Sequence, residues 1–256
     1  MDINKNSYIF GFATILIVIL SAILSTSYIR LKPFQKINID LEKQQNILNS
    51  IGINVDRDSA KETYSEYIKE EIVLDINCFE IPGNAFELDL AIELKKDERK
   101  QKLPLFISEL EGNKKYIIPL RGKGLWGPIW GFIALDDDLT TIFGAVFDHS
   151  KETPGLGAEI NTTSFQEPFR GKTIFEDEDF TSITVIKGGA KEGDMHGVDA
   201  ISGGTITSNG VSDMIQERLS RYLPYFKKKI EESKVKAIFN FMDTTSINYD
   251  TLQIIQ

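Results

Sequence analysis

The chain has 256 residues, and its 38 acidic residues outnumber 29 Lys and Arg, which gives a formal net charge of −9. It contains 1 Cys and 2 His, so this chain alone cannot form an internal disulfide, an iron–sulfur cluster or a multi-histidine metal site. The acidic balance argues against binding to nucleic acid, because phosphate neutralisation needs clustered basic residues.

The first predicted element is a membrane-spanning helix at residues 8–29. No charged residue occurs from Asn6 to Ile29, and about 20 apolar residues suffice to cross the hydrocarbon core of a bilayer. A cleaved signal peptide is the alternative, but its apolar region usually spans only about 7–15 residues after a basic segment. Here Lys5 is the only basic residue before the run, and we expect a retained single-pass anchor.

Charge separates the anchor from the remainder of the chain. The first 36 residues contain four basic residues and one acidic residue, so the residues after them carry a net charge of −12. More basic residues follow the predicted span than precede it. The positive-inside rule, taken alone, would therefore leave the following domain in the cytoplasm.

Two short helices are predicted after the span, in a stalk-like segment at residues 30–84. The first covers residues 38–51 and should end at Gly52, because glycine readily adopts the left-handed conformation that terminates helices. The second covers residues 63–72, which are rich in charged side chains.

From about Ala85 the sequence becomes typical of β-structure. Apolar and acidic residues alternate over residues 86–94, and residues 116–120 form a short apolar run, so each is predicted to be a strand. Two apolar runs at residues 130–135 and 140–147 flank three aspartates and predict a hairpin. We interpret the aspartates as a solvated turn, with a cation site as the alternative.

A further strand and at least one helix are predicted in the C-terminal part. Residues 181–187 are rich in β-branched side chains and predict the strand. The helix begins near residues 208–210, because apolar residues then recur at helical spacing as far as Tyr222. Pro224 interrupts this pattern, and residues 227–241 are predicted to be helical or mixed.

Strands and helices that do not alternate regularly predict an α+β fold. In this fold a single N-terminal transmembrane helix precedes a soluble domain with a mixed or antiparallel sheet and flanking helices. The predicted segments are an N-terminal tail at residues 1–7, the transmembrane helix at 8–29, the helical stalk at 30–84, the soluble domain at 85–242 and a C-terminal tail at 243–256.

The most informative segment for function is Asp199-Ala-Ile-Ser-Gly-Gly-Thr205. Its small residues Ser202, Gly203 and Gly204 leave a threonine hydroxyl accessible just before a predicted helix. The N-terminus of a helix presents free N–H groups and the positive end of the helix dipole, which favour a phosphate. From the pattern alone, a Ser/Gly turn that only caps the helix is the simpler interpretation.

This segment resembles the flavinylation motif of the FMN-binding domain family, in which a flavin transferase esterifies the phosphate of FMN to a threonine. The resemblance implies that Thr205 accepts the flavin, with Thr207 as the second choice. Gly204 stands where the family usually has alanine, a difference of one methyl group.

Two more segments match the same family. Gly122-Lys-Gly-Leu-Trp126 is similar to its glycine–tryptophan loop, and Glu152-Thr-Pro-Gly-Leu-Gly157 is similar to its second signature. An isoalloxazine ring needs apolar walls and a few backbone donors, which these two segments can supply. His149, just before the second segment, is interpreted as a surface residue near the turn. The cofactor-binding residues that the resemblance implies are Thr205, Ser202, Gly203, Gly204, Thr207, Leu125, Trp126, Glu152, Thr153, Gly155 and Leu156.

Together with the N-terminal span, the three motifs resemble the C subunits of bacterial Na⁺-translocating NADH:quinone reductases. This resemblance implies an electron-relay subunit that carries covalent FMN on Thr205, with no catalytic side chain and no metal site of its own. It also implies the other subunits of the complex as partners and a flavin transferase for maturation. No dinucleotide fingerprint is recognisable in the sequence, so the NADH and quinone sites are assigned to other subunits.

The resemblance places the protein in the bacterial cytoplasmic (inner) membrane, with the soluble domain periplasmic, against the literal charge count. A related alternative is the G subunit of an Rnf-type complex, which has the same covalent flavin but uses ferredoxin as donor. The long segment at residues 31–85 favours the C subunit. An alternative of another class is a membrane-anchored scaffold or binding module without flavin.

Overall fold

The computed structural model describes residues 6–236 and divides into two compact units, residues 1–44 and residues 45–256. Helix α1 (Asn6–Ser50) supplies the described part of the first unit and the first residues of the second. Among the described helices, α1 alone is long and apolar enough to cross a membrane by length and composition, with a mean hydropathy of 2.4 in its most apolar window. The predicted helix at residues 38–51 is the last part of α1.

The end of α1 is a hydrogen-bonded cap in the second unit. Gly52 follows the helix with φ +79°, and its N–H donates to Asn49 O at 2.9 Å. The N–H of Ile53 donates to Leu48 O at 3.0 Å. This pair of bonds satisfies carbonyls that the helix leaves free, and it confirms the predicted role of Gly52.

The sheet begins earlier in the chain than the sequence pattern predicts. Helix α2 (Ala60–Tyr67) ends where strand β1 (Ile68–Leu74) starts, so the predicted helix at residues 63–72 is wrong in its second half. In the pairing with β2 (Leu103–Leu110), Ile68, Val73 and Leu74 of β1 are buried, and this tertiary contact outweighs local helix propensity. The first strand of the sheet therefore precedes Ala85, where the sequence pattern first becomes typical of β-structure.

Residues 86–94 do not form the predicted strand. They contain a turn and the short helix α3 (Leu90–Glu93), followed by the 3₁₀ helix η1 (Glu98–Lys100). The side chain of Asp89 accepts a hydrogen bond from Ala91 N at 2.7 Å. Such a cap starts a helix, and a local hydrogen bond of this kind is not visible in the alternation of apolar residues.

Five antiparallel strands form the main sheet, in the order β1-β2-β3-β4-β5. The predicted strand at residues 116–120 lies in β3 (Asn113–Lys123), and the predicted hairpin is β4 (Pro128–Leu135) with β5 (Ile142–His149). Neighbouring strands therefore also follow each other in the chain, as in a meander.

The three aspartates between β4 and β5 form a hydrogen-bonded turn. The carboxylate of Asp138 accepts bonds from Thr140 N and Thr141 N, both at 2.8 Å, and from Thr141 Oγ1 at 2.6 Å. Asp136 pairs with Lys115. No group of three or more His, Cys, Asp or Glu side chains within residues 6–236 is arranged to hold a metal ion.

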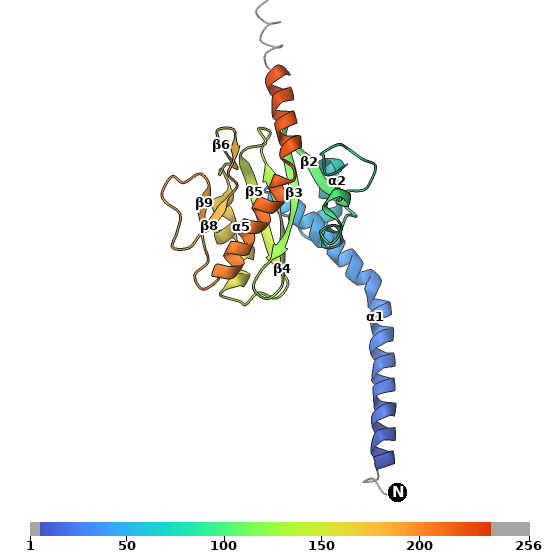
Figure 1. Ribbon diagram of the computed structural model, residues 1–256. Helices are drawn as coiled ribbons and strands as arrows, with labels where there is room; N and C mark the ends of the chain where they lie inside the picture. The colour runs from blue at the N-terminus through green and yellow to red at the C-terminus, as the bar shows by residue number, and fades with distance from the viewer. Residues whose placement is uncertain (1–5, 237–256) are drawn as a thin grey trace, which may run out of the picture. The chain divides into compact units, whose positions relative to one another are not determined.

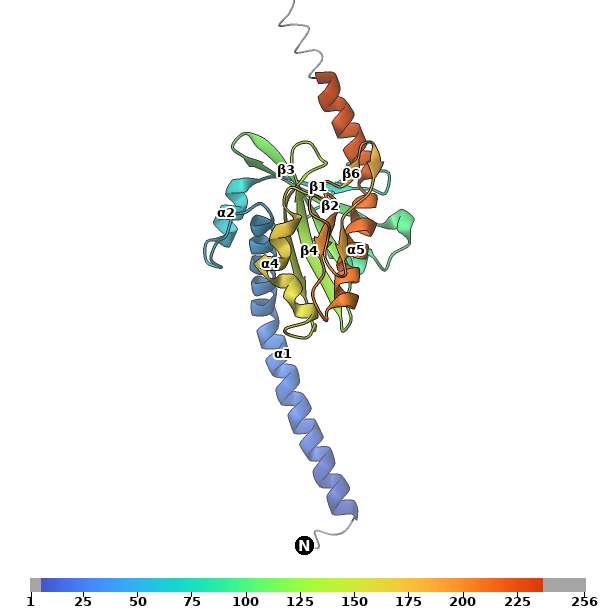
Figure 2. The same ribbon diagram turned by 90° about the vertical axis from the view of Figure 1, so that its left-hand side faces the viewer.

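Both faces of the sheet are buried. In β3, Tyr116, Ile118 and Leu120 belong to one apolar cluster and Ile117 to the other, because successive side chains of a strand point to opposite faces. Helix α5 (Thr205–Ser220) covers the first face (Figure 1). Figure 2 shows the last turns of α1 on the opposite side of the sheet from α5, where Ile47, Leu48 and Ile51 join the second cluster.

The remaining elements are short and connect β5 to α5. The predicted strand at residues 181–187 is observed only at residues 184–186. Helix α5 begins at Thr205, before the predicted start at residues 208–210. Residues 223–236 form a further helix, which includes most of the segment predicted to be helical or mixed at residues 227–241. The end of that segment and the predicted C-terminal tail at residues 243–256 lie outside the described residues. The connecting elements are η2 (Gly157–Asn161), α4 (Thr163–Gln166), η3 (Glu167–Phe169), β6 (Phe175–Glu176), β7 (Asp179–Phe180), β8 (Thr184–Ile186) and β9 (Gly197–Asp199).

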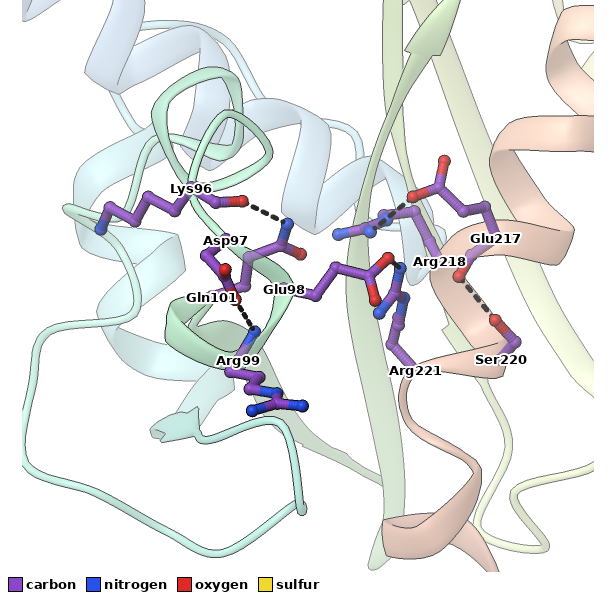
Figure 3. Close-up of polar contacts among 9 residues, drawn as sticks. All are labelled: Lys96, Asp97, Glu98, Arg99, Gln101, Glu217, Arg218, Ser220 and Arg221. Carbon is purple, nitrogen blue, oxygen red and sulfur yellow. Dashed lines mark hydrogen bonds and ion pairs between the residues drawn. The ribbon is translucent and has the colours of Figure 1, made fainter.

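The C-terminal end of α5 is fixed to the segment around η1. Glu98 Oε1 accepts a hydrogen bond from Arg221 Nη2 at 2.8 Å (Figure 3). Beside it, the hydroxyl of the fully buried Tyr222 donates to Pro104 O at 2.7 Å. These contacts fix the C-terminal end of α5. The N-terminus of the same helix lies at the candidate site.

Candidate functional site

The three sequence motifs meet around the side chain of Glu152. Its Oε1 accepts a hydrogen bond from Trp126 N at 2.8 Å, and its Oε2 accepts one from Thr207 Oγ1 at 2.6 Å. Leu156 and Gly203 are also neighbours, because a Cβ atom at Gly203 would lie 2.6 Å from Leu156 Cδ2. The structure therefore brings together segments that are far apart in the chain.

The two candidate threonines lie in different environments. Thr205 is the first residue of α5 and is partly exposed. Thr207 is 1% exposed, and its hydroxyl is already bonded to Glu152. A modifying enzyme can reach the first hydroxyl more readily than the second.

The N-terminus of α5 has free hydrogen-bonding capacity. The N-cap residue is Gly204, and no side chain caps this helix. Consequently no side chain caps the N–H groups of the first turn, and the positive end of the helix dipole lies at Thr205. This combination suits a phosphate group attached to the Thr205 hydroxyl.

Exposed apolar side chains surround this helix end. Leu125, Trp126 and Leu156 are 49%, 65% and 41% exposed, and all three come from the predicted motifs. Ile206, between the two threonines, is 57% exposed and was not among the predicted residues. Its exposure follows from the early start of α5, which directs Ile206 away from the core while burying Thr207.

Comparison with known proteins identifies the relatives of this chain. Residues 124–220 match the model of the FMN-binding domain. The C subunit of the Na⁺-translocating NADH-quinone reductase of Vibrio alginolyticus is 34% identical over 212 residues, which cover 76% of this chain and 82% of the relative. This chain belongs to that family of C subunits.

Solved structures of the family share the fold. The crystal structure of the C subunit from Parabacteroides distasonis is 44% identical, has a TM-score of 0.72, and covers 77% of this chain and 96% of its own. That of Shewanella oneidensis is 26% identical with a TM-score of 0.65, and it covers 73% of this chain and 96% of its own. These matches support the α+β fold with an antiparallel sheet.

The residues around α5 of this C subunit fit an FMN group in two respects. An accessible hydroxyl at an uncapped helix N-terminus suits the phosphate, and exposed apolar side chains suit the ring. The predicted residues Ser202, Gly203 and Gly204 form the turn into α5, where Gly203 has φ +76°. Thr153 and Gly155 lie in the turn before η2, where Thr153 O accepts hydrogen bonds from Leu156 N and Ala158 N.

Glu152 is ionised at neutral pH in this C subunit. Burial acts to raise the pKa of its carboxyl, but hydrogen bonds from the Thr207 hydroxyl and from backbone N–H groups of the loop at Trp126 outweigh burial and hold the pKa below its ordinary value. The site thus contains a buried carboxylate whose two oxygens both accept hydrogen bonds from the protein.

His149 contributes to the same part of the C subunit through its ring. Its Nδ1 accepts a hydrogen bond from Glu152 N at 3.3 Å, so it supports the turn that carries Glu152. The sequence pattern predicts a surface position for this histidine, whereas the structure makes it half-buried at the end of β5. Spacing within the sequence does not reveal this role, because it depends on where the turn folds back.

Proposed function

We propose that this chain is the electron-relay subunit of a membrane-bound Na⁺-translocating NADH:quinone reductase and that it carries FMN as a phosphoester on Thr205. The supporting observation is the accessible Thr205 hydroxyl at the uncapped start of α5, beside exposed apolar side chains. The similarity to named C subunits over 76% of the chain favours this function over an Rnf-type G subunit and over a flavin-free scaffold.

In this proposal each part of the site has a separate role. Thr205 Oγ1 provides the ester oxygen, and the first-turn N–H groups of α5 stabilise the phosphate charge. Leu125, Trp126 and Leu156 pack against the ring and restrict water, while Ser202, Gly203 and Gly204 let the backbone approach closely. When bound, FMN supplies one-electron redox chemistry, which requires no acid–base side chain.

Covalent attachment also suits an electron carrier in a larger assembly. An attached cofactor cannot dissociate, and a membrane anchor keeps the domain at a high effective concentration near other subunits. We propose those subunits and a flavin transferase as partners, with the C subunit in the inner membrane.

A denaturing gel tests the attachment site. The full-length chain is expressed with a flavin transferase, and the gel is inspected under ultraviolet light. We expect a fluorescent band for the wild type and for Thr207→Ser, and no band for Thr205→Ala. Absence of a wild-type band, or a band that persists in Thr205→Ala, contradicts the attachment at Thr205.

We further propose that the soluble domain is periplasmic. Lys100 is exposed, and Cys78 is the chain's one cysteine and is partly buried. In a Cys78→Ser background, Lys100→Cys should react with a membrane-impermeant thiol reagent in intact cells. Reaction only after the cells are lysed would place the domain in the cytoplasm, as the charge count alone suggests.

A further inference from the structure

Glu152 connects the two sides of the proposed flavin site. One oxygen of its carboxylate binds the backbone of the loop at Trp126, and the other binds the first turn of α5 through Thr207. These partners are 26 and 55 residues away in sequence from Glu152. Trp126 is a proposed ring contact and Thr205 is the proposed attachment point, so the carboxylate lies between the groups that must hold the two ends of one cofactor.

The surroundings of this carboxylate are shaped to enclose it. A Cβ atom at Gly157 would lie 2.6 Å from Glu152 Oε2 and 2.4 Å from Thr207 Oγ1. A Cβ atom at Gly124 would lie 2.6 Å from Glu152 Oε1. Neither glycine has a positive φ, so the requirement at both positions is space for the carboxylate and not backbone conformation.

The carboxylate has little surface left for a ligand. Glu152 is 5% exposed, and both oxygens accept short hydrogen bonds from the protein. A flavin could reach the carboxylate only through this small exposed fraction, whereas the bonds of the carboxylate reach both the Trp126 loop and the first turn of α5. Glu152 therefore acts on the site through its neighbours.

We propose that Glu152 is a positioning residue that fixes the distance between the Trp126 loop and the N-terminus of α5, and so holds the ring wall in register with the attached flavin. The proposal rests on the proposed function, since it presupposes FMN on Thr205. Attachment of the flavin to Thr205 does not need Glu152, whereas the contact between Trp126 and the ring does.

Flavin emission provides the measurement, because a tryptophan packed against an isoalloxazine ring quenches its fluorescence. The full-length chain is matured with a flavin transferase and purified in detergent. The emission of the folded protein is divided by that of the same sample after denaturation, which corrects for the amount of flavin attached. We expect a low ratio for the wild type and a higher ratio for Trp126→Phe.

The decisive comparison is a double-mutant cycle. Glu152→Ala should keep the fluorescent band on a denaturing gel but raise the emission ratio to the Trp126→Phe value. Adding Trp126→Phe to Glu152→Ala should then give no further rise, because the tryptophan has already left the ring. Glu152→Gln should retain the wild-type ratio, since its amide can accept from Trp126 N and donate to the Thr207 hydroxyl.

The outcomes distinguish this proposal from the proposed function. A wild-type ratio in Glu152→Ala, or an undiminished effect of Trp126→Phe in that background, overturns the positioning role while leaving the attachment intact. Absence of a fluorescent gel band from the wild-type protein overturns the proposed function itself. If Glu152→Ala does not fold, Thr207→Val breaks only the bond to α5, and an unchanged ratio in that variant also overturns the positioning role.

Discussion

At the scale of single residues, the turn that leads into α5 sets the conditions for the site. Gly203 has φ +76° and lies against Leu156, whereas Gly204 has the ordinary φ of −104°. The two adjacent glycines of this motif therefore differ in backbone conformation: the left-handed φ of Gly203 favours glycine, whereas the φ of Gly204 suits any residue.

Substitution of these glycines should reveal this difference. Gly203→Ala introduces a methyl group 2.6 Å from Leu156 Cδ2 and places a side chain in the left-handed region, at a cost of about 1–2 kcal/mol. For Gly203→Ala we expect a lower thermal unfolding midpoint and a weaker flavin band on the denaturing gel. Gly204→Ala is the matched control, because its φ suits alanine; its new Cβ would lie 3.0 Å from Ile201 Cγ2 and 3.3 Å from Gly157 N, so these neighbours must move by only a few tenths of an ångström. Equal losses in both variants would contradict this distinction.

Asp138 should make stability depend on pH in the acidic range. Burial acts to raise the pKa of its carboxyl, but hydrogen bonds from Thr141 and Thr140 hold the pKa below its ordinary value. A lowered folded-state pKa contributes stability above the unfolded value of about 3.9, and this contribution is lost as pH falls through the folded-state pKa.

The corresponding measurement is chemical unfolding of Asp138→Ala and wild type. Asp138→Ala should be clearly less stable at about pH 7, and the difference should shrink as the pH falls below about 4. Asp137→Ala, at an equally exposed position of the same turn, leaves the hydrogen bonds of Asp138 to Thr140 and Thr141 in place and should change the free energy of unfolding by less than about 0.5 kcal/mol. A constant difference between Asp138→Ala and wild type across this pH range would refute this pH dependence.

At the scale of elements, α5 connects the site to the core. Its Val211, Met214, Ile215 and Leu219 are buried against the sheet, while its first turn carries the proposed attachment residue. Contacts at its far end include an exposed ion pair and a buried hydrogen bond (Figure 3 shows the ion pair). These two contacts should contribute unequally to stability.

The substitutions Tyr222→Phe and Arg221→Ala compare the contributions of the buried hydrogen bond and the ion pair to stability. Tyr222→Phe leaves the buried carbonyl of Pro104 without its donor and should lower the free energy of unfolding by about 1–3 kcal/mol. Arg221→Ala removes a largely solvated pair with Glu98 and should cost less than about 1 kcal/mol. Denaturant unfolding monitored by tryptophan fluorescence measures both, and a larger loss in Arg221→Ala would reverse the assignment.

At the scale of the whole molecule, the soluble unit begins inside α1. Ile47 and Leu48 are fully buried and Ile51 is 2% exposed, so the last turns of this helix supply core residues. A chain that starts at residue 45 should fold without the anchor, remain in the soluble fraction and still accept flavin. A chain that starts at residue 52 loses three buried apolar side chains, each worth about 2–5 kcal/mol, and should be recovered mainly as aggregate. Equal solubility and flavin content of the two chains would contradict this boundary.

Much of the fold and part of the site could be predicted from local sequence. The hairpin of β4 and β5 follows from two apolar runs around an acidic turn, and the end of α1 follows from Gly52. The failures at residues 63–72 and 86–94 have two separate physical causes. Their states depend on pairing with β2 and on a side-chain cap, and neither contact is expressed in the spacing of apolar residues.

Residue order alone establishes the uncharged N-terminal segment, the acidic remainder of the chain and the order of three motifs similar to those of FMN-binding domains. The different environments of the two threonines arise only in the folded chain, where Thr205 is partly exposed and Thr207 is buried against Glu152. The tertiary structure also shows that Glu152 joins segments 26 and 55 residues away. Burial and hydrogen-bond partners of this kind arise when distant segments pack together, so no local pattern of residues can specify them.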